Sequence, residues 1–245
     1  MDETLRDLLA GNADHVANTP RDALESVQDG QRPSVVSMCC SDSRVSQEGM
    51  WAVDRPGEHF TPSNIGNQVW DADVGERIVN GSVLYPIHHC GTETVAVVGH
   101  TGCGAVTAAY DVARGEPAPR PLGVSKLVEL LVPVVESGLA DSRVDASPDG
   151  TPADGVDEAT VRDQLVEYNV HEQVDFLREA PEVPDRVSAY GFVYDFHGTY
   201  GDDLGRTYLV NLDGTTGPTA IRDATPETVR ETLGSTFDAA LESLL

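Results

Sequence analysis

Short continuous apolar runs recur along the chain and predict buried strands. The clearest is Thr94–Gly99 (TVAVVG), which is apolar throughout and bounded by glycine, as expected for a central parallel strand covered on both faces. Shorter strands are expected at Ser34–Met38, His59–Asn64, Arg186–Asp195 and Arg206–Leu212. Together these runs predict one sheet.

Segments with helical spacing lie between these strands. Residues 3–30 suggest two short helices, residues 104–113 a third, and residues 122–135 carry leucines and valines at helical intervals. A longer helix is expected around 166–177, and Thr225-Pro226-Glu227 is expected to open a final helix with Thr225 as its cap. The alternation predicts an α/β fold, a mostly parallel β-sheet flanked by helices.

The chain of 245 residues is long enough for one sizeable core, so we expect a single domain over 1–245. Residues 1–30 are expected to form an N-terminal helical arm. Residues 137–157 lack periodicity and are rich in Asp, Gly and Pro, which predicts an acidic surface loop.

The charge balance is strongly acidic, with 41 acids against 16 bases, a formal charge of −25 and Lys126 as the only lysine. The resulting electrostatic field repels nucleic acid and anionic membranes. Repulsion among the acidic groups also destabilises the folded state, and concentrated salt would screen that repulsion. This composition resembles that of cytosolic proteins from extreme halophiles. An acidic tail for a basic partner is the alternative, but the acids are spread along the chain.

No apolar run is long enough to predict a membrane span. The first residues, MDETLRDLLAGNADHV, are acidic and amphipathic rather than basic and apolar, so we expect an unprocessed, cytoplasmic chain. In that compartment the cysteines at 39, 40, 90 and 103 are expected to bind metal, act in catalysis or pack in the core rather than form disulfides.

Three side chains are expected to converge at one edge of the sheet. Cys40 and His100 each end a predicted strand, and Cys103 opens the next helix. Two thiolates and one imidazole suit tetrahedral zinc, and three protein ligands leave the open position typical of catalytic zinc. Taken singly, each of these residues is more often an ordinary core or surface residue.

The motif Cys-x-Asp-Ser-Arg at 40–44, followed by His-x-x-Cys at 100–103, resembles the β-class carbonic anhydrases. The likeness extends from the N-terminal helices to the VYD stretch at 193–195. It implies one Zn²⁺ per subunit held by Cys40, His100 and Cys103, with Asp42 and Arg44 as the catalytic dyad. It also implies that Tyr85 and Gly104 belong to the substrate pocket.

The implied reaction is the zinc-dependent, reversible hydration of carbon dioxide to bicarbonate by zinc-bound hydroxide. Asp42 would orient the hydroxide as a hydrogen-bond acceptor, and the planar guanidinium of Arg44 would hold Asp42 ionised. The resemblance further implies a homodimer or an assembly of dimers, with the N-terminal helices reaching across the partner.

Several positions depart from the family pattern. A regulated subgroup holds bicarbonate with a tryptophan and an arginine where this chain has Ser37 and Ser63, which favours an open zinc site here. Arg55 stands where many relatives carry Gln or Glu, near the substrate entrance.

Three other functions are compatible with the same residues. One is hydrolysis of carbonyl sulfide or carbon disulfide on the same fold and metal. Another is a cysteine enzyme in which His100 activates Cys40. The third is a non-catalytic zinc protein in which Asp42 completes a closed set of four ligands.

Overall fold

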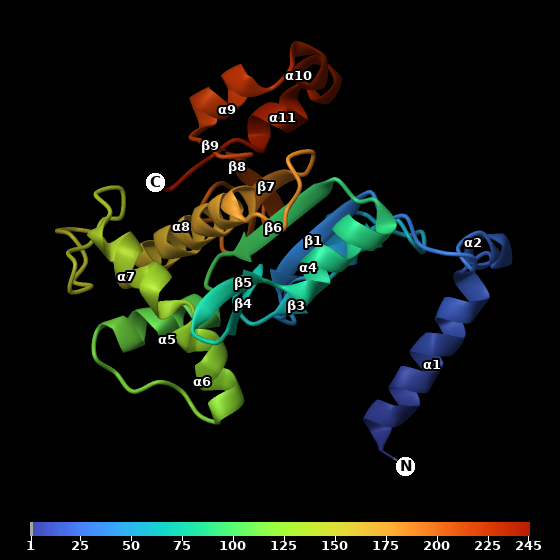
Figure 1. The fold of residues 1–245 in the computed structure, drawn as a ribbon, viewed down its shortest axis with the longest axis horizontal. Helices are drawn as coiled ribbons and strands as arrows, with labels where there is room; N and C mark the ends of the chain where they lie inside the picture. Colours follow the sequence, from blue (N-terminus) through green and yellow to red (C-terminus); the bar gives the residue numbers. More distant parts are fainter. Residues whose placement is uncertain (1) are drawn as a thin grey trace.

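The computed structural model describes residues 2–245, and its centre is a seven-stranded, mostly parallel sheet (Figure 1). The strands follow the order β2-β1-β6-β7-β8-β9, and β3 pairs with the end of β1. Strand β1 runs parallel to β2, β3 and β6, and β6 runs parallel to β7, whereas β7 with β8 and β8 with β9 are antiparallel pairs. The bounds are β1 Val35–Cys40, β2 His59–Phe60, β3 Ser63–Asn64, β6 Thr94–His100, β7 Ser188–Asp195, β8 Arg206–Leu212 and β9 Thr215–Thr216. The expected fold class is confirmed.

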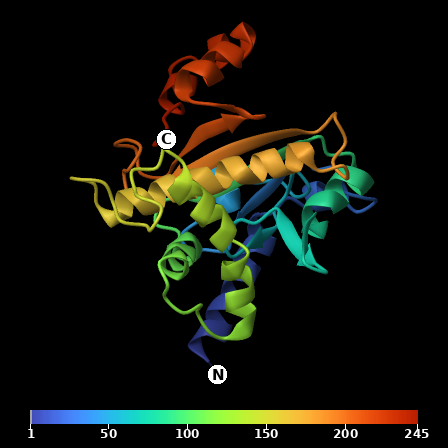
Figure 2. The same ribbon diagram turned by 60° about the vertical axis from the view of Figure 1, so that its left-hand side comes forward.

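Helix α8 (Glu158–Glu179) lies along one face of the sheet, against β6 and β7 (Figure 2). Its apolar stripe of Val166, Val170, Val174 and Leu177 is fully buried. The close approach needs a glycine on β7: a Cβ at Gly191 would lie 2.6 Å from Cγ1 of Val170. Helices α5 (Gly104–Ala113), α6 (Leu122–Glu129) and α7 (Val132–Ala140) complete this layer.

The opposite face of the sheet has a thinner cover. Here Cys39, Val45, Ala96 and Val98 form a small buried cluster with Trp51 packed against it. The only helix beside this cluster in the described part of the chain is the single turn α3 (Gln47–Met50).

The apolar run 122–135 is helical, as expected, and it forms two helices, α6 and α7, because Pro133 lies in the first turn of the second. The start of the expected loop at 137–157 needs correction. Helix α7 then runs to Ala140 with Leu139 buried, so residues 137–140 are helical and the irregular stretch begins at Asp141.

The C-terminal region forms three short helices beyond the sheet: α9 (Pro218–Ala224), α10 (Glu227–Leu233) and α11 (Ser235–Ala239). Contrary to the expectation from the sequence, Thr225 does not cap α10. Its hydroxyl donates instead to the carbonyl oxygen of Ile221, one turn back in α9, and Pro226 occupies the cap position.

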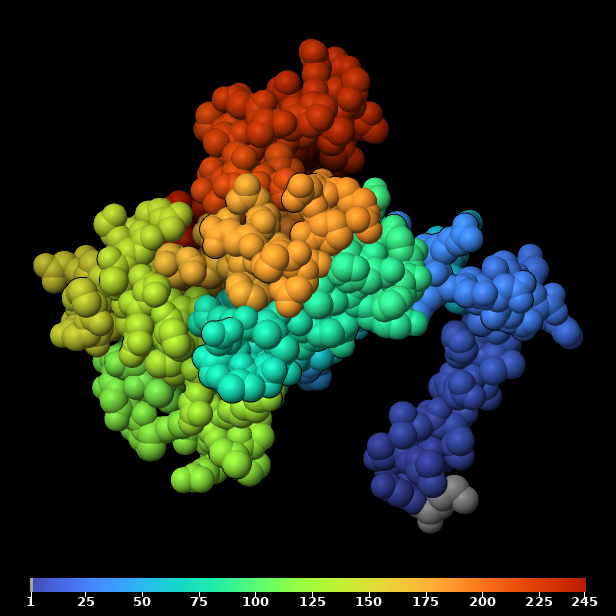
Figure 3. Space-filling model, viewed as in Figure 1, coloured from blue at the N-terminus to red at the C-terminus, as the bar shows by residue number. Residues whose placement is uncertain are grey.

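The first two helices, α1 (Glu3–Asn18) and α2 (Arg21–Glu25), project from the body (Figure 3). Helix α1 buries no residue, and Leu5, Leu8, Leu9 and Val16 on it are 47–68% exposed. The remaining elements are a hairpin of β4 (Trp70–Asp73) and β5 (Glu76–Val79), helix α4 (Gly81–Tyr85) and a π-helical turn, η1 (Pro86–Cys90). None of the helices in residues 2–245 is long and apolar enough to cross a membrane.

Candidate metal centre

Cys40, His100 and Cys103 come together at the carboxyl edge of the sheet, as the sequence predicts. Strands β1 and β6 are parallel neighbours, so their last residues, Cys40 and His100, meet at the same edge. Cys103 follows as the N-cap residue of α5. One ligand atom from each side chain lies within 4.8 Å of the others, and all three residues are buried.

The imidazole of His100 is held with one nitrogen ready for a ligand. Nδ1 lies 3.0 Å from the carbonyl oxygen of Thr101, and because a carbonyl only accepts, Nδ1 carries the proton. Nε2 is buried and has no hydrogen-bond partner among the described residues. A buried ring nitrogen without a partner is costly unless something binds it. An unpartnered Nε2 beside two thiols therefore fits a zinc ion.

The hydrogen bond between the two thiols shifts their pKa values in opposite directions. A hydrogen bond from Cys103 lowers the pKa of Cys40 to about 4, whereas the same bond and burial raise the pKa of Cys103 well above its ordinary value. Backbone N–H groups of Val106 and Ala105, at the start of α5, point to the Cys103 sulfur and favour its thiolate. Binding a divalent cation would release the remaining proton.

The other two cysteines lie outside this cluster. Cys39 points to the opposite face of the sheet, as strand alternation predicts, and burial raises the pKa of its thiol to about 12. Cys90 ends η1, and all four cysteines are free thiols.

Asp42 lies directly beside the cluster and is held by Arg44. The Arg44 Nε and backbone N–H groups each donate to Oδ1 at 2.9 Å, and Nη2 donates to Oδ2 at 2.7 Å. These hydrogen bonds hold the pKa of Asp42 well below its usual range. Oδ2 lies 3.8 Å from Nε2 of His100, so an ionised carboxylate faces the nitrogen that is free to bind metal.

Phe196 packs against both Arg44 and His100. Its ring stacks on His100 with centroids 5.7 Å apart, and the guanidinium carbon of Arg44 lies 4.6 Å from the centroid of the same ring. Sequence reasoning did not identify Phe196, which follows the VYD stretch directly.

The tripeptide Asp-Ser-Arg occurs a second time, at 141–143, with the same pairing. Arg143 donates to Asp141 through its backbone N–H, Nε and Nη2 at 2.9, 3.0 and 2.8 Å. The ion pair is therefore a local property of the tripeptide. What distinguishes the pair at 42–44 is its position beside the buried cluster.

The other residues named from the sequence lie outside the three-residue cluster. Tyr85 is 49% exposed at the end of α4, with Phe60 and His89 as its ring neighbours. Gly104 is the first residue of α5, directly after Cys103, and a Cβ there would meet no atom within 4 Å. Ser37 is buried and accepts a hydrogen bond from Nε1 of Trp51 at 3.0 Å.

Sequence reasoning missed two buried carboxylates that hold the segment between His100 and Cys103. Asp195 accepts from the hydroxyl of Thr101 at 3.2 Å, and Asp163 accepts from the backbone N–H of Gly102 at 2.7 Å. A signal for Asp163 does exist, because it occupies the helical apolar stripe that continues through Val166 and Val170.

Comparison with known proteins gives a consistent result. The sequence model of the family described as "Carbonic anhydrase" matches residues 35–201. A carbonic anhydrase of Pseudomonas aeruginosa is 30% identical over 185 residues, covering 74% of this chain and 77% of the relative. Carbonic anhydrase 2 of Mycobacterium tuberculosis is 28% identical over 218 residues, covering 86% and 93%.

Solved structures share the fold. A β-carbonic anhydrase from Coccomyxa, in complex with acetazolamide, superposes with a TM-score of 0.65 at 23% identity, covering 96% of this chain and 97% of that one. A β-carbonic anhydrase from Sordaria macrospora, described as tetrameric, has a TM-score of 0.64 at 21% identity, covering 86% and 98%.

Proposed function

Because the chain belongs to the β-carbonic anhydrase family and is an enzyme that reversibly hydrates carbon dioxide to bicarbonate, we propose that Cys40, His100 and Cys103 form its reaction centre, holding one Zn²⁺ per subunit. The observation that carries the proposal is the buried, unpartnered Nε2 of His100 beside two thiols. A bound zinc ion supplies Lewis-acid activation of water for attack on carbon dioxide.

Asp42 and Arg44 act on the attacking water rather than on the metal. Arg44 donates to both carboxylate oxygens of Asp42, which would keep this carboxylate from serving as a further zinc ligand. An ionised carboxylate only accepts hydrogen bonds, so Asp42 binds a proton of the water and directs an oxygen lone pair toward the substrate. Ser37 and Ser63 also support an open zinc site, because the regulated subgroup has a tryptophan and an arginine at these positions.

Carbon dioxide is small and apolar and needs a confined approach. The Phe196 ring, packed between His100 and Arg44, supplies one apolar wall. We assign Gly104 and Tyr85 to the same pocket. The open space at Gly104 Cα supports the first assignment, and the family resemblance supports the second.

The arm and the thin cover of one sheet face support a homodimer or an assembly of dimers. Helix α1 exposes four large apolar side chains and buries none within its own subunit. We propose that residues 1–30 form an arm that packs on a partner subunit, that 1–245 is otherwise a single domain, and that 141–157 is its acidic surface loop. The Sordaria macrospora relative described as tetrameric is consistent with such assembly.

The composition and the free thiols bear on the type of organism and on the cellular compartment in which the protein works. A net charge of −25 with a single lysine supports an origin in a halophile. Four free cysteines, two of them proposed ligands, support a reducing compartment, and we propose the cytoplasm.

Stopped-flow measurement of carbon dioxide hydration, with zinc stoichiometry measured on the same sample, tests the proposal. Wild-type protein should turn over with one zinc per subunit, Cys103→Ser should lose both zinc and turnover, and the control Cys90→Ser should keep both. Full zinc in Cys103→Ser would contradict the ligand set. Parallel assays with carbonyl sulfide measure the related hydrolysis, and slow hydration with rapid sulfide release would contradict the assigned substrate.

A further inference from the structure

The two residues between His100 and Cys103 determine how these proposed ligands face each other. Gly102 has a left-handed backbone with φ +62, and a Cβ there would lie 2.5 Å from Cε1 of His197. The left-handed backbone therefore favours glycine, and a side chain there would displace the His197 ring. Because glycine also has the greatest backbone freedom, something outside the segment must fix the Gly102 peptide.

Asp163 provides that restraint from helix α8. Its Oδ1 accepts the Gly102 N–H at 2.7 Å, and its side chain is 6% exposed. Its other oxygen, Oδ2, accepts the hydroxyl of Thr199 at 3.0 Å. One buried carboxylate thus connects three segments: α8, the segment with two proposed ligands, and the loop that follows β7.

The loop that follows β7 is itself fixed in a way that makes this connection rigid. Asp195 accepts the backbone N–H groups of His197, Gly198 and Tyr200 at 3.0, 2.9 and 2.8 Å. The same carboxylate accepts the Thr101 hydroxyl, which lies next to His100. Asp163 and Asp195 therefore restrain adjacent residues of one short segment from two different elements.

We propose that Asp163 is a positioning residue for the metal centre: by binding the Gly102 N–H, it sets the spacing of His100 and Cys103 for zinc. Asp163 reaches the ligands only through the Gly102 peptide. The inference rests on the proposed function, in which those two residues and Cys40 hold the metal. Residues that orient metal ligands typically contribute roughly 10- to 100-fold to metal affinity.

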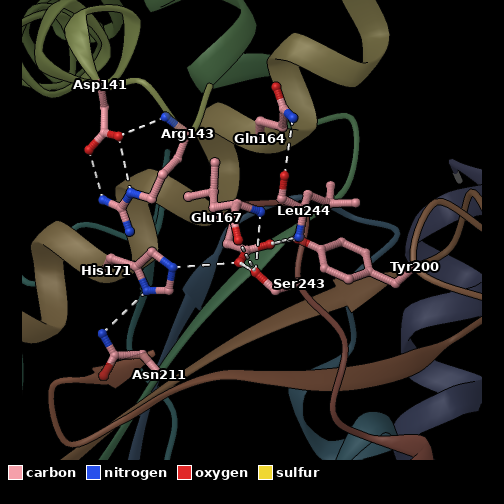
Figure 4. A network of polar contacts seen from close by, with 10 residues as sticks. Asp141, Arg143, Gln164, Glu167, His171, Tyr200, Asn211, Ser243 and Leu244 are labelled. Atoms are coloured by element: carbon pink, nitrogen blue, oxygen red, sulfur yellow. Dashed lines mark hydrogen bonds and ion pairs between the residues drawn. The ribbon is translucent and has the colours of Figure 1, made fainter. Parts of the chain in front are cut away.

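Helix α8 offers a matched control one turn further on. Glu167 is also a fully buried carboxylate, but it accepts from the hydroxyl of Tyr200 at 2.7 Å and the backbone N–H of Leu244 at 2.8 Å (Figure 4). Ser243 also donates to it, and the interactions of Glu167 include none with residues 100–103. Replacing Glu167 therefore removes a buried carboxylate without releasing Gly102.

The test compares zinc dissociation constants by chelator competition, at a temperature where circular dichroism shows each variant folded. Asp163→Leu, similar in shape but without an acceptor, should bind zinc about 10- to 100-fold more weakly. Asp163→Asn keeps an acceptor for Gly102 and should recover wild-type affinity within a few-fold. Glu167→Met should lower the unfolding temperature yet leave zinc affinity within a few-fold.

Equal zinc affinity in Asp163→Leu and wild type would overturn the inference, as would equal weakening in Asp163→Leu and Glu167→Met. If a variant does not fold, hydrogen exchange of the Gly102 amide in metal-free wild-type protein provides a second test that needs no variant. Protection of this amide supports the inference, and exchange at the rate of an unprotected amide overturns it. Unchanged zinc binding in Cys40→Ser would instead contradict the proposed metal centre itself.

Discussion

Oδ2 of Asp42 lies 3.8 Å from Nε2 of His100, and that nitrogen has no hydrogen-bond partner within the described chain. This relationship brings an ionised acceptor and a free metal-binding atom to one point at the carboxyl edge of the sheet. The role assigned to Asp42 therefore depends on its place in the fold. The second Asp-Ser-Arg tripeptide, at 141–143, makes the same ion pair but does not lie beside the Cys-His-Cys cluster.

Replacing Asp42 should impair turnover without removing zinc. Asp42→Asn keeps the size of the side chain but offers an amide where the water needs an acceptor, so kcat should fall on the order of 100-fold. Zinc content should remain at one per subunit. Asp141→Asn, in the matching tripeptide, should leave kcat unchanged. Loss of zinc together with stability in Asp42→Asn would instead indicate a closed structural site.

The convergence of Cys40, His100 and Cys103 could be predicted because these residues stand at the ends of strongly patterned elements. Cys40, His100 and Cys103 follow apolar runs whose ends must meet in a parallel sheet, and the motif spacing is specific. The buried carboxylate that restrains the segment between His100 and Cys103 could not be predicted from the sequence in the same way. Asp163 lies in α8, far along the chain, and only the packing of α8 on β6 brings it to Gly102.

Errors in the predicted helices have local causes. Thr225-Pro226-Glu227 has the composition of a helix start, but Thr225 already ends α9, and its hydroxyl is used there. Residues 137–140 are small and weakly patterned, yet they continue α7 because Leu139 is buried. A hydrogen bond within α9 decided the first case, and the burial of Leu139 decided the second.

Stability at acid pH should depend on Asp195. Burial acts to raise the pKa of this carboxyl, but the backbone N–H groups of Tyr200, His197 and Gly198 hold it below its ordinary value. Its contribution is therefore complete above the pKa of an unfolded aspartate, near 4, and is lost as pH falls through the lower folded value.

Asp195→Asn should lower the free energy of unfolding by roughly 1–3 kcal/mol at pH 7, because it weakens the acceptor of several buried donors. The difference from wild type should shrink at pH 3. Urea unfolding of metal-free protein at pH 7, 5 and 3 measures this, with the exposed Asp203→Asn as control. A difference that stays constant down to pH 3 would be inconsistent with the depressed pKa.

The arm should hold subunits together through its apolar side chains. Replacing Leu8 and Leu9, which are 68% and 61% exposed, with aspartate should convert the assembly to smaller species. Val74→Asp, at a residue 96% exposed on the β4–β5 hairpin, should leave the mass unchanged. Size-exclusion chromatography with light scattering measures the mass. A monomeric wild-type protein would rule out the proposed assembly.

Salt should stabilise the fold by screening its charge of −25. The Debye length falls from about 10 Å at 0.1 M to about 3 Å at 1 M salt, so most of the gain in unfolding temperature should occur by about 1 M. KCl and NaCl should act alike, because screening depends on ionic strength. An unfolding temperature that does not change between 0.1 and 1 M of either salt would contradict the proposed adaptation.

X-ray absorption at the zinc edge, on wild-type enzyme with one zinc per subunit, tests the metal centre most directly. We expect two sulfur scatterers and two lighter ones, one of them an imidazole nitrogen, with one sulfur lost in Cys40→Ser. A site without sulfur, or one that keeps both sulfurs in Cys40→Ser, would contradict it.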